Sequence, residues 1–338
     1  MAKRARLVDV AKLAGVSHTT VSWALKGDPR ISPETRKKVM DAARKLNYHP
    51  NLLARALVNG RTNTLAIVAS FFSSHFEMEV LKGIEQQLMD TGSELGVLLF
   101  TTRGSKKREE DIIADVIKSG RADGLITLNI SLSVNLSSLA CEYAFPVVLI
   151  EGKGRCADTI RIDNPGGSYA AVSALVKAGA KNIAIVSGEI HTEEPGRSPM
   201  ERLIGARRSL RAHGYGFDKS QVFFIERYYF EEGYTLFPRI LDAMPNVDGI
   251  FCAAGDMVAL GLLAAMRDRG ISVPEDVRLV GYDDIPASSL VSPTLTTVRY
   301  NMPRMGATAV DFISAALSGE KEKKHYIEPS VLIGRQSC

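Results

Sequence analysis

The sequence predicts a small all-α headpiece followed by a larger α/β domain of two lobes with parallel sheets. Positive charge is concentrated in residues 1–62, where 13 lysines and arginines face 4 acidic residues, for a net charge of +9. The rest of the chain carries a net charge of −5. The hydrophobic pattern also changes near residue 64, from short helical stretches to apolar runs that alternate with helices. The 338 residues suffice for about two domains.

Three short helices are expected in the headpiece. The first, 7–14, ends at Gly15, which can supply a tight turn. Ser17 stands at the N-cap position of the second helix, 18–26. Ser32 caps the third and is followed by a proline, which suits the first helical position. Two helices joined by a glycine-containing turn of this length form a helix-turn-helix.

After residue 64 the chain alternates between predicted strands and helices, which indicates parallel sheets covered by helices. The expected strands are 64–69, 96–101, 124–128, 147–150, 159–162, 182–187, 221–226, 249–253, 278–282 and 295–299. The pattern runs once before about Asp163 and once after it, so we expect two similar lobes. A ligand would bind between them, at the carboxyl ends of the strands.

Composition argues against several classes of protein. The longest apolar runs, 64–72 and 144–150, fall far short of the roughly 20 residues of a membrane span. The basic N-terminus is not followed by an apolar stretch, so we expect no secretory signal and a cytoplasmic, nucleoid-associated protein. The four cysteines include no Cys-x-x-Cys pair, which argues against a disulfide framework or a zinc finger and for buried, reduced side chains.

Catalytic motifs are absent from the sequence as well. The six histidines lack metal-ligand spacing, the two Gly-x-Gly pairs do not continue into a phosphate loop, and no Gly-x-Ser-x-Gly occurs. We therefore expect no catalytic residue, no metal and no cofactor. The charge separation favours a polyanion as partner, although a solvated basic face alone would give the same count.

Three headpiece segments resemble the LacI/GalR family of lactose-repressor-type transcription regulators. They read Leu-Val-Asp-Val-Ala-Lys-Leu-Ala-Gly-Val-Ser-His-Thr-Thr-Val-Ser at 7–22, Ile-Ser-Pro-Glu-Thr-Arg at 31–36 and Leu-Asn-Tyr-His-Pro-Asn at 46–51. The larger domain resembles the family's effector domain, which is similar to periplasmic sugar-binding proteins. Its matching segments are 83–85, 121–126, 162–164, 202–205, 280–284, 293–297 and 334–337.

The resemblance implies a headpiece at 1–50, a hinge helix and linker at 51–63, and an effector-binding and dimerisation domain at 64–338. It implies a repressor that binds a palindromic operator as a homodimer and responds to a small molecule, most simply a sugar. Whether that molecule induces or corepresses stays open. A purine or nucleoside, a sugar phosphate or a protein effector are the alternatives, and a periplasmic-type sugar-binding protein is a more remote one.

The second headpiece helix then becomes the recognition helix, whose first residues reach base edges in the major groove. His18, Thr19 and Trp23 fall on the base-reading positions. Trp23 either packs on a sugar or methyl group or covers the headpiece core. Contacts to phosphate or sugar are expected from Ser17, Thr20, Ser22, Arg30 and Asn51. In the hinge, Leu57 matches the leucine that wedges into the minor groove at the operator centre, with Arg55 beside it.

The resemblance also carries over a set of effector-binding residues. They are Ser70, His75, Phe76, Asp163, Arg202, Tyr228, Asp256, Asp283 and Tyr300. Carboxylates and a guanidinium bind pairs of hydroxyls, and aromatic faces cover the apolar side of a sugar ring. Some have simpler interpretations: Asp256 as a helix cap, Phe76 as core and His75 as a surface residue.

Three departures from the family pattern affect the effector site. Gly255 replaces a common asparagine, and the segment 188–202 is longer than usual. Tyr300 replaces the usual glutamine and is expected to narrow the cleft.

Overall fold

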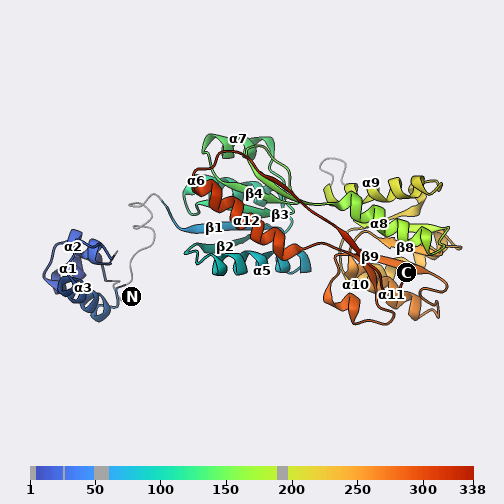
Figure 1. Cartoon of the computed structure of the whole chain (residues 1–338), viewed down its shortest axis with the longest axis horizontal. Coiled ribbons are helices and arrows are strands. Elements are labelled where there is room, and N and C mark those ends of the chain that lie inside the picture. The colour runs from blue at the N-terminus through green and yellow to red at the C-terminus, as the bar shows by residue number, and fades with distance from the viewer. Residues whose placement is uncertain (1–4, 26, 49–60, 189–196) are drawn as a thin grey trace. The chain divides into compact units, whose positions relative to one another are not determined.

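The computed structural model describes residues 5–25, 27–48, 61–188 and 197–338 (Figure 1). The chain divides into two compact units, Met1–Asn63 and Thr64–Cys338. Within the described residues, no helix is both long and apolar enough to cross a membrane.

The first unit holds the three predicted helices, α1 (Leu7–Ala14), α2 (His18–Leu25) and α3 (Pro33–Lys45). Their core consists of small and β-branched side chains, which allow short helices to pack closely. The fully or nearly fully buried members are Val10, Ala11, Val21, Ala24, Val39, Ala42 and Ala43. Gly15 ends α1 in the left-handed conformation, with φ of 69°. Ser32 caps α3 by accepting a hydrogen bond from the Thr35 amide.

In the second unit, one lobe is built on a six-stranded sheet with the order β11-β5-β4-β3-β1-β2. Its strands are β1 (Thr64–Ala69), β2 (Gly96–Thr101), β3 (Gly124–Leu128), β4 (Val147–Ile150), β5 (Asp158–Ile162) and β11 (His325–Glu328), all paired in parallel. Its helices are α5 (His75–Asp90), α6 (Lys106–Ser119), α7 (Val134–Glu142) and α12 (Met302–Leu317). Both faces of the sheet are covered, so β1 is almost wholly apolar: Ile67 packs with the cluster on the α5 side and Val68 with that on the α6 side.

The other lobe has a second six-stranded sheet, with the order β12-β10-β9-β8-β6-β7. Its strands are β6 (Ile183–Gly188), β7 (Val222–Ile225), β8 (Gly249–Cys252), β9 (Arg278–Tyr282), β10 (Thr296–Arg299) and β12 (Val331–Ile333). Its helices are α8 (Asn164–Lys177), α9 (Arg197–Ala212), α10 (Phe230–Ala243) and α11 (Asp256–Arg267), with the 3-10 turns η1 (Lys219–Gln221) and η2 (Pro286–Ser289). Only β12 departs from the predicted parallel arrangement among these strands, because it runs antiparallel to β10.

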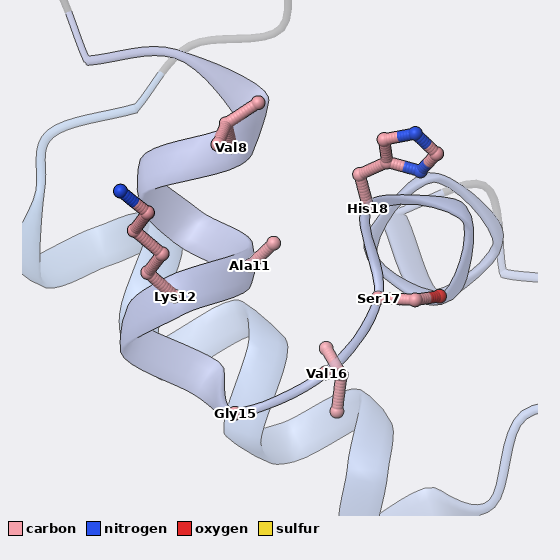
Figure 2. A pocket seen from close by; sticks show the side chains of 7 residues that line it. All are labelled: Val8, Ala11, Lys12, Gly15, Val16, Ser17 and His18. Atoms are coloured by element: carbon pink, nitrogen blue, oxygen red, sulfur yellow. The ribbon is translucent and has the colours of Figure 1, made fainter.

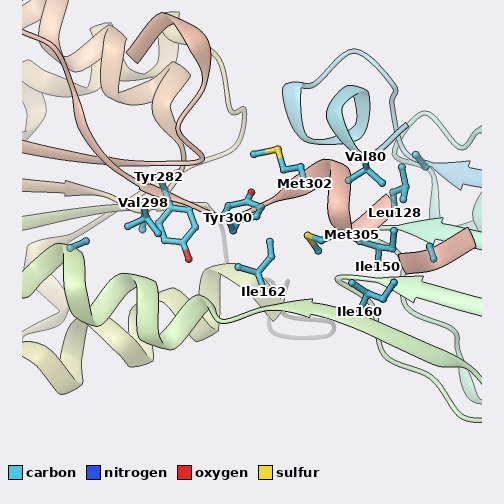
Figure 3. Close-up of a cluster of buried hydrophobic side chains, with 14 of the residues drawn as sticks. Val80, Leu128, Ile150, Ile160, Ile162, Tyr282, Val298, Tyr300, Met302 and Met305 are labelled. Atoms are coloured by element: carbon cyan, nitrogen blue, oxygen red, sulfur yellow. The ribbon is translucent and has the colours of Figure 1, made fainter. Parts of the chain in front are cut away.

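The chain passes between the lobes three times, whereas the sequence pattern predicted one division near Asp163. After β10, helix α12 packs on α5, and β11 then pairs with β5 in the first sheet. In Figure 1 the red helix α12 therefore lies among the blue and green elements of the first lobe. β12 returns the chain to the second sheet. One buried apolar cluster includes side chains of both lobes, and Figure 3 shows Tyr300 between Tyr282 and Met302 within it.

The expectation that no disulfide forms is wrong for one pair of cysteines. Cys141, in the last turn of α7, is bonded to Cys156, just before β5, with their Cα atoms 5.4 Å apart. They are separated by 15 residues, and the chain returns through β4 to bring them together. Cys252 is buried and Cys338 half-buried, and both are free thiols.

Candidate functional site

One face of α2 is packed and the other presents polar side chains. Val21 and Ala24 are buried in the headpiece core, while His18 and Thr19 are exposed. Ser17 holds the first turn, because its Oγ accepts a hydrogen bond from the Thr20 amide at 3.1 Å. This arrangement leaves the start of α2 free to contact another molecule through hydroxyl and imidazole groups, which read base edges well.

Trp23 lies on the surface, so the interpretation that it covers the headpiece core is wrong. Its side chain is 37% exposed, and the Arg30 guanidinium stacks on its ring at 4.4 Å. Arg30 also donates two hydrogen bonds to the Asp28 carboxylate, from Nε at 3.0 Å and from Nη2 at 2.7 Å. These bonds lower the pKa of Asp28 to about 2. Trp23 and Arg30, both of which are predicted to contact DNA, are thus held against each other.

A shallow cavity of about 600 Å³ adjoins the start of α2 (Figure 2). Val8 and Ala11 lie on its α1 side and His18 on its α2 side. Ser22 lies half-buried on α2. The remaining predicted DNA-contacting residues, Asn51, Arg55 and Leu57, lie outside the described residues.

In the second unit, Arg202 forms the centre of a cluster where the lobes meet. Its guanidinium donates to Asn164 Oδ1 at 2.9 Å and to the Ala253 carbonyl at 2.7 Å. It also stacks on the Tyr282 ring at 3.7 Å, and its Nη2 lies 3.7 Å from Asp283 Oδ1. Arg202 is only 9% exposed, and its guanidinium group is surrounded by these four partners.

Helix α9 brings Arg202 to this position because α9 and α8 lie unusually close together. A Cβ at Gly205 would sit 2.2 Å from the Pro165 carbonyl oxygen, so only glycine fits there. The sequence motif of an arginine three residues before a glycine thus has a packing reason.

Asp283 and Tyr300 complete the second-lobe side of the cluster. The Tyr300 hydroxyl donates to Asp283 Oδ1 at 2.8 Å. Asp283 adopts a φ of 102°, which is strained for a residue with a side chain, and strain of this kind concentrates at functional sites. Burial raises the pKa of Asp283, against the opposing effects of Arg202 and the Tyr300 hydroxyl. Tyr300 stands where the family pattern has glutamine; it is 6% exposed and belongs to the buried cluster shared by the two lobes.

The first turn of α5 faces this cluster from the first lobe. The Phe76 ring lies 6.4 Å from the Tyr300 ring, and the charge of His75 lowers the pKa of Asp283. Glu77, which sequence reasoning missed, is 8% exposed and accepts a hydrogen bond from Asn129 Nδ2 at 3.0 Å. Burial raises the pKa of Glu77, and the charge of Asp283 adds to the effect.

Glu151 is a second carboxylate that sequence reasoning missed. It is 5% exposed and accepts three hydrogen bonds, from the Ile162 amide at 2.6 Å, Asn164 Nδ2 at 2.9 Å and Ser198 Oγ at 2.6 Å. Asn164 in turn accepts from Arg202, so Glu151 belongs to the same network. Its position directly after a predicted strand was a signal that could have found it.

The structure brings five of the predicted effector residues together: His75, Phe76, Arg202, Asp283 and Tyr300. The other four predicted effector residues make contacts of their own. Asp163 caps α8 through a hydrogen bond from the Gly166 amide. Tyr228 is 49% exposed and its hydroxyl lies against Gly188, at the end of β6. Ser70 follows β1, where its carbonyl accepts from the Thr101 hydroxyl.

Asp256 does not offer a free carboxylate to a ligand in this structure. It is fully buried, and it accepts hydrogen bonds from the Ile285 amide, the Ser288 hydroxyl and the Thr297 hydroxyl. Burial raises its pKa to about 7, although the three hydrogen bonds oppose the shift. Nor does its side chain cap α11, because Gly255 is the N-cap residue. Asp256 instead holds the segment that follows Asp283.

A helix-turn-helix unit with a free polar helix face, together with a two-lobed α/β unit with buried charges between its lobes, defines a DNA-binding regulator with a ligand-binding domain. Comparisons with known proteins agree. Residues 6–51 match the bacterial regulatory proteins of the lacI family, and residues 172–338 match a periplasmic binding protein-like domain.

Individual relatives cover nearly the whole chain. The HTH-type transcriptional regulator DegA of Bacillus subtilis is 32% identical over 337 residues, 98% of this chain and 97% of that protein. A transcriptional regulator CelR–cellobiose complex matches with a TM-score of 0.73 and 29% identity over 99% of this chain and 100% of that one. A Lac repressor dimer bound to operator matches in fold, with a TM-score of 0.85, 24% identity and 99% coverage of both chains.

The chain belongs to the LacI family of bacterial regulatory proteins. It is a DNA-binding transcription regulator of the helix-turn-helix type, and these relatives are regulators and not enzymes.

Proposed function

We propose that this regulator is a repressor that binds a roughly palindromic operator as a homodimer and is controlled by a small molecule held between its lobes. The observation that carries the proposal is the free polar face of α2, above a core of small side chains. His18 and Thr19 read bases, and Arg30 with Trp23 contacts the backbone or a sugar. Residues 51–63 act as the hinge, with Leu57 as the wedge.

A row of exposed apolar side chains on β2, an edge strand of the first sheet, supports the homodimer. Val97, Leu98 and Leu99 are 37%, 40% and 52% exposed, and Phe224 on the edge strand β7 is 46% exposed. Exposed apolar edges of this kind mark association surfaces, and an unprotected edge would promote aggregation. A second copy of this chain covers these edges in our proposal.

The charged cluster around Arg202 supports a small polar effector. Carboxylates accept hydrogen bonds from pairs of hydroxyls, and tyrosine rings stack on the apolar face of a sugar ring. Cellobiose is the ligand in the CelR complex, and a sugar or sugar derivative suits this chain as well. Ligand binding would favour one arrangement of the lobes, and the coupling to DNA cannot exceed the ligand's difference in affinity for the two arrangements.

Substituting His18 or Thr19 by alanine should weaken binding to the selected operator and relax base preference, because each contact to a base edge contributes about 1–3 kcal/mol. The operator is first selected from random DNA with the full-length protein, and affinities are then measured by fluorescence anisotropy. Met40→Ala, an exposed side chain on α3, is the control and should change nothing. Unchanged base preference in both α2 variants would contradict the assignment of the recognition helix.

A further inference from the structure

We propose that Glu77 and Asp283 form an acidic subsite that selects an effector carrying a protonated amine, such as an amino sugar, over its neutral and phosphorylated analogues. The proposal rests on the proposed function, because it takes the lobe junction as the effector site. It deepens that function by naming the chemical class of the ligand.

The hydrogen bonding of Glu77 is incomplete. Its Oε1 accepts from Asn129, whereas Oε2 is shielded from solvent and has no hydrogen-bond partner among the described residues. A buried carboxylate oxygen without a donor is unfavourable by about 1–3 kcal/mol, and more when the group is charged. Glu77 lies in the first turn of α5, the turn that faces Asp283 and Tyr300. A ligand bound there with a donor group would complete the hydrogen bonding of Glu77.

The balance of charge at the junction favours a cation. Within the described part of the chain, the carboxylates of this cluster, Glu77, Glu151 and Asp283, outnumber its one guanidinium, that of Arg202, which faces Asp283 and is linked through Asn164 to Glu151. Among the described residues, the donors to Glu151 are all uncharged, namely the Ile162 amide, Asn164 Nδ2 and Ser198 Oγ, so Glu151 adds negative charge to the cluster. Opposite charges attract and like charges repel strongly in such a poorly solvated place, so a ligand ammonium is favoured.

The same groups disfavour a phosphate. Arg202 is the residue most suited to bind one, but its Nε and Nη1 already donate to Asn164 and Ala253, and its Nη2 faces Asp283. All three guanidinium nitrogens of Arg202 thus already face partners within the protein, which leaves none directed at a ligand phosphate. Of the described residues, His75 is a further group whose positive charge acts on Asp283, and it lies half-buried at the start of α5.

Glu77 should bind an ammonium group more strongly than a hydroxyl group. It carries three donors and a full charge, and hydrogen bonds between charged partners are roughly twice as strong as those between neutral ones. A neutral hydroxyl could fill the same space, but it would leave the excess negative charge uncompensated.

The test uses the full-length protein and matched sets of hexoses at pH 7: glucosamine, galactosamine and mannosamine, their neutral parents, and the corresponding 6-phosphates. Binding is followed by thermal shift and quantified by calorimetry, since a ligand of the native state raises the Tm. We expect at least one amine to bind at least about tenfold more tightly than its parent, a difference of about 1.4 kcal/mol. No 6-phosphate should bind better than its parent.

Two variants assign the effect to Glu77. Glu77→Gln keeps the shape but removes the charge, so it should weaken amine binding at least about tenfold and leave a neutral parent within about twofold. Glu85→Gln removes an exposed charge from the same helix and should change neither. Glu77→Asp serves as the second variant if Glu77→Gln does not fold, and it should retain the preference for the amine. The Tm of ligand-free Glu77→Gln should equal or exceed that of the parent protein, whereas a merely structural Glu77 would lower it.

Amine and parent binding with equal affinity, a 6-phosphate binding more tightly than its parent, or no binding by any amine would each overturn the subsite. DNA binding measured on the same samples separates this from the broader proposal. Intact operator binding with no preference for amines contradicts the subsite alone, whereas loss of operator binding by the parent protein contradicts the proposed function.

Discussion

Arg202→Ala should lower the free energy of unfolding by about 3 kcal/mol, measured by urea denaturation. The substitution removes two hydrogen bonds, to Asn164 and to the Ala253 carbonyl, and the stacking on Tyr282. It also leaves Asp283 poorly solvated and without its counter-ion, and an unpaired carboxylate in such surroundings is strongly destabilising.

A double-mutant cycle separates the charge from the packing. Asp283→Asn removes the carboxylate, so the double variant with Arg202→Ala should be more stable than the sum of the two single effects predicts. Arg208→Ala, at an exposed arginine on the same helix, is the matched control and should cost less than about 0.5 kcal/mol. Equal losses for Arg202 and Arg208 would show that Arg202 does not organise the junction.

Gly83→Ala should destabilise the second unit by about 3 kcal/mol or more, because α5 and α12 cross in backbone contact at this glycine. A Cβ at Gly83 would lie 1.9 Å from the Pro303 carbonyl oxygen, and the reciprocal Gly306 would place its Cβ 2.1 Å from the Val80 oxygen. Backbone atoms cannot move aside as a flexible side chain can, so the helices must separate and leave voids.

Gly216→Ala provides the matched control for this prediction. A Cβ at Gly216 meets nothing within 4 Å, and its backbone is not in the left-handed region. The substitution should be neutral or slightly stabilising, since alanine restricts the unfolded chain more than glycine does. If both glycine variants unfold at the same urea concentration, the close crossing of α5 and α12 is not the reason for glycine at position 83.

Local sequence predicts the helices and strands more readily than it predicts which sheet or lobe each of them joins. The three headpiece helices and the alternation of strands and helices were predicted, because spacing of apolar residues reports which faces are buried. The strands β11 and β12 were not among the predicted elements. That α12 and β11 return to the first lobe was not predicted either, because periodicity can identify an element but not the sheet that it joins. The same reason explains Cys141 and Cys156, whose proximity depends on the path of the chain through β4.

The candidate site was predictable in part. Arg202 and Asp283 were found through their motifs, and both lie in the junction cluster. Asp256 was misjudged because its three donors come from residues 285, 288 and 297, so that only the folded chain reveals them. Glu77 was missed because an acidic residue in a first helical turn usually interacts with the helix dipole and solvent. Its burial against Asn129 is a tertiary effect.

The central claim is that the basic first unit binds operator DNA, and its most direct test is the salt dependence of that binding. The full-length protein and its selected operator are titrated at several salt concentrations, and the logarithm of the association constant is plotted against the logarithm of the salt concentration. If a dimer neutralises about six phosphates, affinity should fall about 10³-fold between about 50 and 200 mM salt, because counterions are released on binding. A flat profile would contradict the DNA-binding account.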